Sequence, residues 1–159
     1  MIKIKTISLR NFLSIGNVTQ SVKLDNPGLT LVLGENLDLG GGSSKNGVGK
    51  TSILQGISFA LYGQPLTNIR KDNLVNSINQ KNMMVSIEYE INGKQYRIER
   101  GRKPNILRYY INDGIVKDPS SDEGHGESKW TQNEIEKALH LSHTMFKNIV
   151  VLHTKTQPF

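Results

Sequence analysis

The chain carries the sequence Asn46-Gly47-Val48-Gly49-Lys50-Thr51-Ser52 between a β-branched apolar segment, residues 29–33, and an amphipathic pattern that starts at residue 53. A strand, a glycine-rich loop that ends in Gly-Lys-Thr, and a helix together form the phosphate cradle of many nucleotide-binding sites. The stretch therefore predicts an α/β fold and makes a nucleoside triphosphate the first candidate ligand.

Each residue type in this loop suits a polyphosphate. Gly47 and Gly49 have no Cβ, so the backbone N–H groups can approach the phosphate oxygens closely. Lys50 can bring a compact ammonium charge to the β and γ phosphates. The hydroxyl of Thr51 is of the type that ligates Mg²⁺ in such sites, and Ser52 supplies another short donor.

The loop departs from the usual glycine spacing. The pattern Gly-x4-Gly-Lys-[Ser/Thr] would place a glycine at position 44, where the chain has Ser44. Joining Gly34-Glu35 directly to Asn46 restores the spacing, so residues 36–45 are interpreted as an insertion in the loop. Lengthening a loop costs less than about 2 kcal/mol by chain-closure scaling, which is compatible with nucleotide binding. The insertion is either an exposed, tolerated loop or a flap over the nucleotide.

The segment after the loop predicts a helix that Gly63 and Pro65 bring to an end. Its apolar positions recur at helical spacing and form one stripe. These positions are Ile53, Leu54, Ile57, Ala60 and Leu61. The N-terminus of this helix would add about half a positive charge to the phosphate site.

The remaining periodicity predicts several short strands and two further helices. Strands are expected at 2–9, 18–24, 29–33, 83–91, 94–100, 106–111 and 149–152, with Asn92-Gly93 as a hairpin turn. Thr131-x-x-Glu134 is a capping box that would open a helix running to Leu139, with Ile135, Ala138 and Leu139 inward. Ser142 would cap a second, short helix that carries Met145 and Phe146.

Length, composition and net charge limit the class of protein. At 159 residues and 17.8 kDa the chain is one domain's worth of material. The absence of cysteine excludes disulfides and thiolate metal sites and suits a reducing cytosol. No apolar run reaches the length of a membrane span, and no membrane partner is expected. The formal charge of +6 favours polyanionic partners such as ATP or nucleic acid.

Basic and acidic clusters leave two interpretations open. The short basic run of Arg97, Arg100, Arg102 and Lys103 is either a solvated hairpin face or a DNA-backbone contact. The acidic residues within 117–129 lie in a polar loop, and solvation is favoured there over a two-metal nuclease site. His140 and His143 are interpreted as surface or helix-end residues rather than metal ligands.

Several motifs together resemble the N-terminal half of an SMC-like ABC ATPase head. They are Ile7-x-Leu9-x-Asn11-Phe12, Gly28-Leu29-Thr30-Leu31-Val32-Leu33-Gly34, Asn46 to Ser52, Phe59-Ala60-Leu61-Tyr62-Gly63, residues 68–76 and residues 145–152. The sequence is similar to the SbcC-type ATPase subunits of recombination and repair nucleases, and among them to the tailed-phage recombination-endonuclease subunits. The resemblance covers nearly the whole chain and is weakest across 113–129.

This resemblance implies a P-loop NTPase fold of the ABC/SMC-head type, with antiparallel hairpins in a mixed sheet plus a phosphate-binding helix. It implies ATP and Mg²⁺ as cofactors, bound by Asn46, Gly47, Val48, Gly49, Lys50, Thr51 and Ser52, with Thr51 on the metal. It also implies a homodimer whose heads sandwich two nucleotides, an SbcD-type nuclease partner, and DNA. Leu13, Ser14 and residues 75–77 would lie near the base and ribose.

The chain also departs from that family. The usual Q-loop glutamine falls at Thr154, with Gln157 three residues later. The signature motif, the Walker B aspartate, the catalytic glutamate and the switch histidine cannot be placed, so no catalytic residue is assigned. We therefore expect residues 1–159 to be an N-terminal lobe, with the C-terminal lobe and coiled coil absent and an apolar sheet edge exposed unless that lobe docks.

The expected function is that of an ATP-binding subunit in a double-strand-break repair and recombination exonuclease–endonuclease complex. It would hydrolyse ATP only when completed by its C-terminal lobe. We expect it in the cytoplasm, which is the host cytosol if the gene is phage-encoded. The alternative is a non-hydrolysing DNA-binding or clamp fragment with a vestigial P-loop. A standalone P-loop kinase or GTPase is disfavoured by the three strands expected before the loop.

Overall fold

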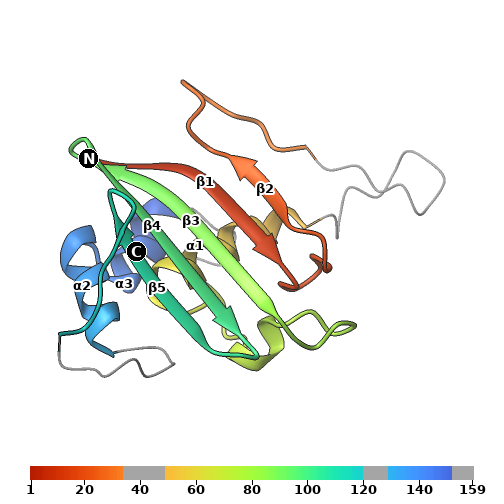
Figure 1. The fold of residues 1–159 in the computed structure, drawn as a ribbon. Helices are drawn as coiled ribbons and strands as arrows, with labels where there is room; N and C mark the ends of the chain where they lie inside the picture. The colour runs from red at the N-terminus through yellow and green to blue at the C-terminus, as the bar shows by residue number, and fades with distance from the viewer. Residues whose placement is uncertain (34–48, 120–128, 152–159) are drawn as a thin grey trace.

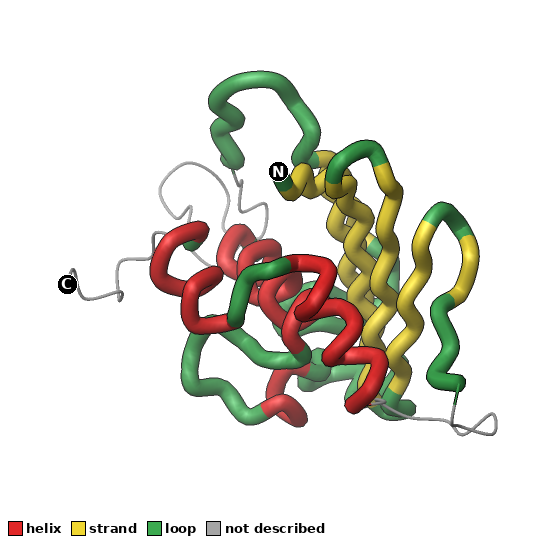
Figure 2. Tube along the Cα trace, turned by 90° about the vertical axis from the view of Figure 1, so that its left-hand side faces the viewer, coloured by secondary structure: helices red, strands yellow, loops and turns green. Residues whose placement is uncertain are grey.

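A six-stranded sheet forms one layer of the protein, and the helices cover one of its two faces (Figures 1 and 2). The computed structural model describes residues 1–33, 49–119 and 129–151. The strands are β1 (Ile2–Arg10), β2 (Gln20–Lys23), β3 (Met83–Ile91), β4 (Lys94–Arg102), β5 (Ile106–Ile111) and β6 (Gly114–Ile115). Their order is β2-β1-β3-β4-β5-β6, and every pairing between these described strands is antiparallel.

Alternation along the strands places the apolar side chains on the face that the helices cover. Ile7 on β1 lies opposite Ile87 on β3, which lies opposite Ile98 on β4, and all three are fully buried. The predicted strands 83–91 and 94–100 are confirmed as this central hairpin. Asn92 and Gly93 turn it with φ values of 50° and 81°, which the right-handed twist of paired strands requires.

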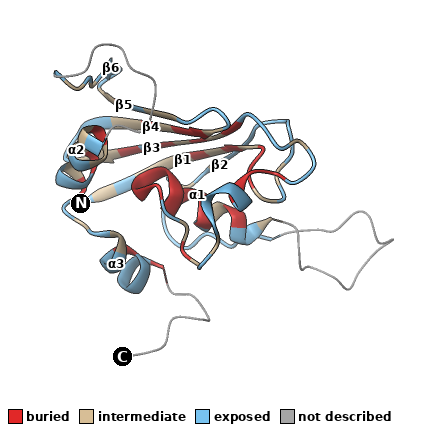
Figure 3. Ribbon diagram, turned by 90° about the horizontal axis from the view of Figure 1, so that it is seen from below, coloured by how far each residue is buried: buried red, intermediate tan, exposed pale blue. Residues whose placement is uncertain are grey.

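Helix α1 (Lys50–Tyr62) crosses the buried face of the sheet and contacts β1, β3 and β4 (Figure 3). Gly63 ends it in the left-handed conformation, with its N–H bonded to the Phe59 carbonyl at 2.8 Å, as the sequence predicted. A Cβ on Gly56 would lie 2.5 Å from a Leu9 methyl group, so this glycine lets α1 approach β1 closely. Leu54, expected in the apolar stripe, is instead 38% exposed.

The C-terminal helices differ from their predicted boundaries. Helix α2 (Lys129–Leu139) already includes Lys129 and Trp130, so the capping box expected at Thr131 is wrong and Thr131 is buried inside the helix. Helix α3 (His143–Met145) is capped as predicted, because the Ser142 hydroxyl accepts a hydrogen bond from the Met145 N–H. A 3₁₀ turn, η1 (Lys71–Leu74), precedes β3.

Two predicted strands are not formed. Residues 146–150 form a π-helical turn, η2 (Phe146–Val150), in place of the buried strand expected at 149–152, and Ile149 and Val150 are exposed. The segment 29–33 has no strand pairing, and its leucine side chains are 73% exposed or more. A strand needs a neighbouring backbone to satisfy its N–H and C=O groups, and no strand of the described residues lies beside this segment.

Candidate nucleotide site

The first turn of α1 is the centre of the candidate site. Gly49 caps it with φ 85° and ψ 4°, a left-handed conformation that side-chain-bearing residues rarely adopt. The Ser52 N–H bonds to the Gly49 carbonyl at 3.0 Å, which closes the turn. Lys50 and Thr51 follow Gly49 with exposed side chains. The earliest N–H groups of a helix have no acceptor within it, so this end can donate to an anion.

A cavity of about 450 Å³ lies against this turn. Gly49 and Lys50 border it, and Ser14 and Gln20 supply further polar groups. Its apolar lining comes from Leu9, Ile15, Val22, Val32, Leu33 and Ile53. Apolar walls with a few polar groups are typical of sites that hold the base and ribose of a nucleotide, and here they adjoin the predicted phosphate-binding turn.

The loop after β1 forms one wall of the cavity and packs directly on the turn. The Ser14 hydroxyl lies 3.3 Å from the Ser52 hydroxyl, and Ser52 is buried. Ser52 was predicted to be a short donor to the ligand, but here its hydroxyl contacts a protein partner. A side chain on Gly49 would meet Ile15 and Ser14 at 3.5 Å. The turn and the loop therefore fit together as one surface.

An asparagine network holds this loop in place from behind. Asn76 donates from its side-chain amide to the Leu13 carbonyl at 2.9 Å and from its backbone N–H to the Asn11 carbonyl at 2.8 Å. The Leu13 N–H bonds to the Leu74 carbonyl at 2.7 Å. Asn11 is 1% exposed and adopts φ 49°. The network fixes the backbone that presents Ser14 to the cavity.

The structure thus divides the residues that the resemblance placed near the base and ribose. Ser14 lines the cavity, whereas Leu13 and Asn76 stand behind it as supports. Gln20 lines the cavity and was missed, because a lone glutamine in a strand carries no signal in the sequence. Asn46, Gly47 and Val48, the insertion 36–45, and the two Q-loop candidates Thr154 and Gln157 lie outside the described residues.

The histidines do not form a metal centre in the described part of the chain, where no group of three or more His, Cys, Asp or Glu residues could hold a metal ion. His143 Nε2 lies 3.0 Å from the Ser58 hydroxyl, and that hydroxyl donates to the Gln64 carbonyl at 2.8 Å. Since Ser58 has one proton, His143 Nε2 is the donor between them. Burial, with Lys147 nearby, lowers the pKa of His143.

The arginine run does not form a single basic surface. Arg97 stacks over the Tyr110 ring, with its Cζ 4.2 Å from the ring centroid, and Arg102 donates to the Asp72 carboxylate at 2.8 Å. Arg100 is 2% exposed and donates to the Ala60 carbonyl at the C-terminal end of α1. These contacts favour structural roles for the run over a shared contact with DNA.

Comparison with known proteins agrees with this geometry. The family described as the AAA domain matches residues 6–157, which include the whole candidate site. The chain belongs to this family. Among curated proteins, Exonuclease subunit 2 of Escherichia phage RB69 is 34% identical over 152 residues, covering 96% of this chain and 24% of the relative. Its counterpart in Enterobacteria phage T4 is 33% identical with the same coverage. The chain therefore spans about a quarter of the length of these relatives.

A more distant relative and two solved structures are also similar to the chain, and the solved structures share its fold. The DNA double-strand break repair Rad50 ATPase of Methanococcus maripaludis is 26% identical, covering 94% of this chain and 13% of the relative. A structure described for ATP-driven dimerization of SMC ATPases has a TM-score of 0.59 at 20% identity, covering 94% of this chain and 86% of the other. The Smc head domain of Pyrococcus furiosus has a TM-score of 0.56 at 20% identity, covering 90% of this chain and 34% of the other.

These matches confirm two expectations from the sequence. The resemblance to SMC-like ATPase heads and to the phage nuclease subunits is confirmed by the family and its curated relatives. The fold class, an N-terminal lobe of the ABC/SMC-head type, is confirmed by the solved heads.

Proposed function

We propose that residues 1–159 are the ATP-binding N-terminal lobe of an SMC-like ATPase subunit in a DNA break-repair and recombination nuclease complex. The observation that carries this proposal is the first turn of α1, where Gly49 and Lys50 border a largely apolar cavity and Thr51 follows them in the helix. The names of the phage and archaeal relatives, a nuclease subunit and a break-repair ATPase, support the biological setting.

The residues present fit ATP with Mg²⁺. The ammonium of Lys50 would contact the phosphates, and the Thr51 hydroxyl would be the protein ligand to the metal; both residues are exposed. Bound Mg²⁺ would neutralise part of the phosphate charge. Asn46, Gly47, Val48 and Ser52 complete the proposed site on the basis of the motif. The residues around the cavity would hold the nucleoside and exclude water from it.

Hydrolysis requires groups beyond those around this cavity. Phosphoryl transfer to water needs a residue that positions the attacking water, and no carboxylate lines the cavity among the described residues. The unpaired apolar segment 29–33 offers an edge to which further strands of the same protein could add. We therefore place the catalytic groups on a C-terminal lobe, beyond a coiled coil. Separately, we regard residues 36–45 as an insertion in the loop, because leaving them out restores the usual glycine spacing.

The proposed partners follow from the same assignment. They are a second copy of the head across two sandwiched nucleotides, an SbcD-type nuclease subunit, and DNA. No helix in the described ranges, 1–33, 49–119 and 129–151, is long and apolar enough to cross a membrane. A cytoplasmic site of action, the host cytosol for a phage-encoded protein, is part of the proposal and accords with the absence of cysteine.

Titration of a fluorescent ATP analogue, with and without Mg²⁺, tests the proposal on the 159-residue chain. Lys50→Ala should abolish binding, because it removes the cation nearest the phosphates. Lys94→Ala, which removes an exposed charge from the far hairpin turn, is the matched control and should bind like the wild type. Equal affinity of Lys50→Ala and wild type would refute the assignment. DNA binding that is insensitive to ATP would instead favour the non-hydrolysing clamp alternative.

A further inference from the structure

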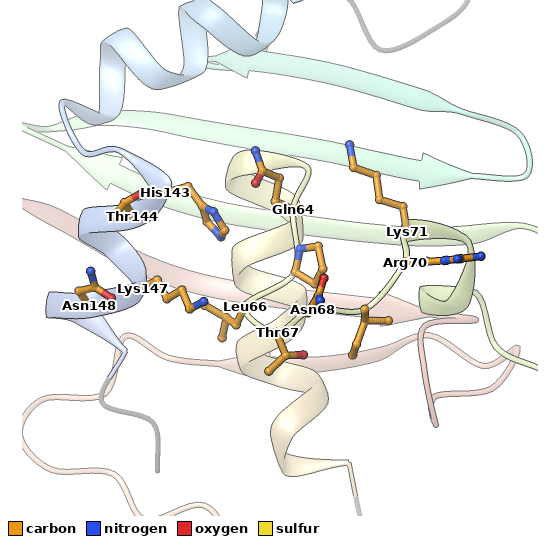
Figure 4. Close-up of a pocket in the computed structure, with 12 residues that line it drawn as sticks. Gln64, Leu66, Thr67, Asn68, Arg70, Lys71, His143, Thr144, Lys147 and Asn148 are labelled. Atoms are coloured by element: carbon orange, nitrogen blue, oxygen red, sulfur yellow. The ribbon is translucent and has the colours of Figure 1, made fainter. Parts of the chain in front are cut away.

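A second hollow of about 720 Å³ lies beside the C-terminal end of α1, away from the nucleotide site. One wall is the connection 64–71, and the other is formed by His143 and Thr144 with Lys147 and Asn148 of η2 (Figure 4). We call this hollow the basic groove. Helix α1 has thirteen residues, so its two ends lie about 20 Å apart at 1.5 Å per residue. The basic groove and the nucleotide cavity share no lining residue.

The basic groove combines three cations with no carboxylate. Arg70, Lys71 and Lys147 line it, and all three side chains are exposed. None of them forms an ion pair with an acidic side chain in the part of the chain that the structure describes. Asp72, the nearest acidic residue in the sequence, is paired with Arg102 at 2.8 Å. The three charges therefore remain available to a polyanion.

The arrangement of the cations distinguishes an extended anion from a compact one. Lys147 extends from η2 toward Leu66, whereas Arg70 and Lys71 lie at the opposite rim and point in different directions (Figure 4). A single phosphate group requires donors that converge on one point. Cations on two rims of an open groove match a polymer whose charges are spaced along it, as phosphates are in nucleic acid.

The neutral groups of the groove favour a duplex over a single strand. Single strands are held largely by aromatic side chains on which bases stack. Tyr62, whose ring packs against His143 and Phe146 beside this wall, is only 3% exposed. His143 is itself bonded to Ser58. Asn68, Thr144 and Asn148 remain as hydroxyl and amide donors of the kind that contact backbone phosphates.

We propose that the basic groove binds the sugar–phosphate backbone of double-stranded DNA, independently of base sequence, through Arg70, Lys71 and Lys147. This inference rests on DNA as a partner in the proposed function, but it does not rest on the nucleotide site. Lys71→Gln with Lys147→Gln should leave the affinity for the fluorescent ATP analogue unchanged, because neither residue lines the nucleotide cavity, so failure of either proposal can be recognised separately.

Fluorescence anisotropy with a labelled duplex, measured between about 50 and 200 mM salt, tests the groove on the 159-residue chain. The double variant Lys71→Gln with Lys147→Gln should bind about tenfold more weakly. Its slope of log affinity against log salt should be shallower by about 1.8, because two phosphate contacts are lost. The control, Lys23→Gln with Lys94→Gln, removes the same charge from β2 and β4 and should stay within about twofold of wild type.

Three results would overturn the proposal. Equal losses in both double variants would show a general effect of net charge. Tighter binding of a single strand than of the duplex, lost in the groove variant, would identify a different ligand. Calorimetric binding of inorganic tripolyphosphate that the groove variant abolishes, while duplex affinity is unchanged, would identify a small-anion site. Circular dichroism of each variant verifies that these surface substitutions leave the fold intact.

Discussion

Arg100 of β4 donates a hydrogen bond from its Nε to the carbonyl oxygen of Ala60 in the last turn of α1, at 3.2 Å, with both residues buried. Helix α1 has no basic residue of its own in that turn. Gln132 of α2 donates to the next carbonyl, that of Leu61, at 3.2 Å, and its side-chain oxygen accepts from Arg100. The C-terminal end of the proposed phosphate-binding helix is thus held by a cation from the sheet and an amide from α2.

Replacing Arg100 should destabilise the fold. Arg100→Met keeps much of the side-chain length but leaves the Ala60 carbonyl and the Gln132 amide oxygen without their donor. Lost hydrogen bonds to buried partners cost about 1–3 kcal/mol each, so we expect a clear drop in the urea midpoint. Arg108→Met, at an exposed ion pair on β5, is the control and should change the midpoint little. Equal midpoints for the wild type and Arg100→Met would contradict this role.

Gly56 should resist substitution even though it lies within a helix. Alanine is favoured over glycine in helices by about 1 kcal/mol on propensity alone. Here the added methyl would lie 2.5 Å from a Leu9 methyl group in the core, and overpacking of that kind costs about 1–3 kcal/mol. We therefore expect Gly56→Ala to lower the free energy of unfolding.

The matched test for Gly56 is a second substitution that relieves the contact between the added methyl group and Leu9. Adding Leu9→Val to Gly56→Ala removes side-chain volume at the point of contact and should cost less than the two single changes combined. Gly16→Ala, where a Cβ would meet nothing within 4 Å, is the neutral control. Strict additivity of the two core substitutions would refute the steric explanation.

Asn76 should affect nucleotide affinity from a position outside the cavity. Its amide bonds to the Leu13 carbonyl, and its side-chain oxygen accepts from the N–H groups of Ile78 and Asn79 at 3.1 Å. Asn76→Ala should free the loop that presents Ser14 and weaken nucleotide binding several-fold. Asn73→Ala, at an exposed position in η1, is the control. A loss of stability with unchanged nucleotide affinity, measured by the same titration, would limit Asn76 to a structural role.

The stability of the chain should fall below neutral pH because of His143. Burial, the largest cause, and Lys147 lower its pKa in the folded state, while Glu136 acts in the opposite direction. The unfolded chain therefore binds a proton on this residue at a higher pH than the folded chain does. The contribution of neutral His143 is present above the ordinary histidine pKa of about 6.5 and is lost as the pH falls through the lowered value.

Urea unfolding at a series of pH values checks this dependence. Between about pH 7.5 and 5, the wild type should lose more stability than His143→Gln, which retains a donor for Ser58 but cannot titrate. His140→Gln, at the exposed C-terminal end of α2, controls for histidines that lie outside this packing. Parallel pH profiles for the wild type and His143→Gln would rule out the assignment.

Local sequence patterns determined the elements whose geometry depends on near neighbours in the chain. Asn92-Gly93 predicted the central hairpin, Gly63 predicted the end of α1, and Ser142 predicted the cap of α3. In each case the turn or cap is formed by groups only a few residues apart in the chain. The Gly-Lys-Thr motif likewise predicted the helix that starts at Lys50, because its glycine supplies the left-handed cap that this start requires.

Only the tertiary structure decided which side chains are buried and what they contact. Arg100 belongs to a basic run that could equally face solvent, and it is buried because the end of α1 and Gln132 offer it acceptors. The apolar segments 29–33 and 149–152 fit buried strands by composition. Residues 29–33 are nevertheless exposed and no described strand lies beside them, while Ile149 and Val150 are exposed at the end of η2 and Val151 is buried. Burial and strand pairing each require two surfaces in contact. The periodicity of one segment describes only its own surface and not the partner surface.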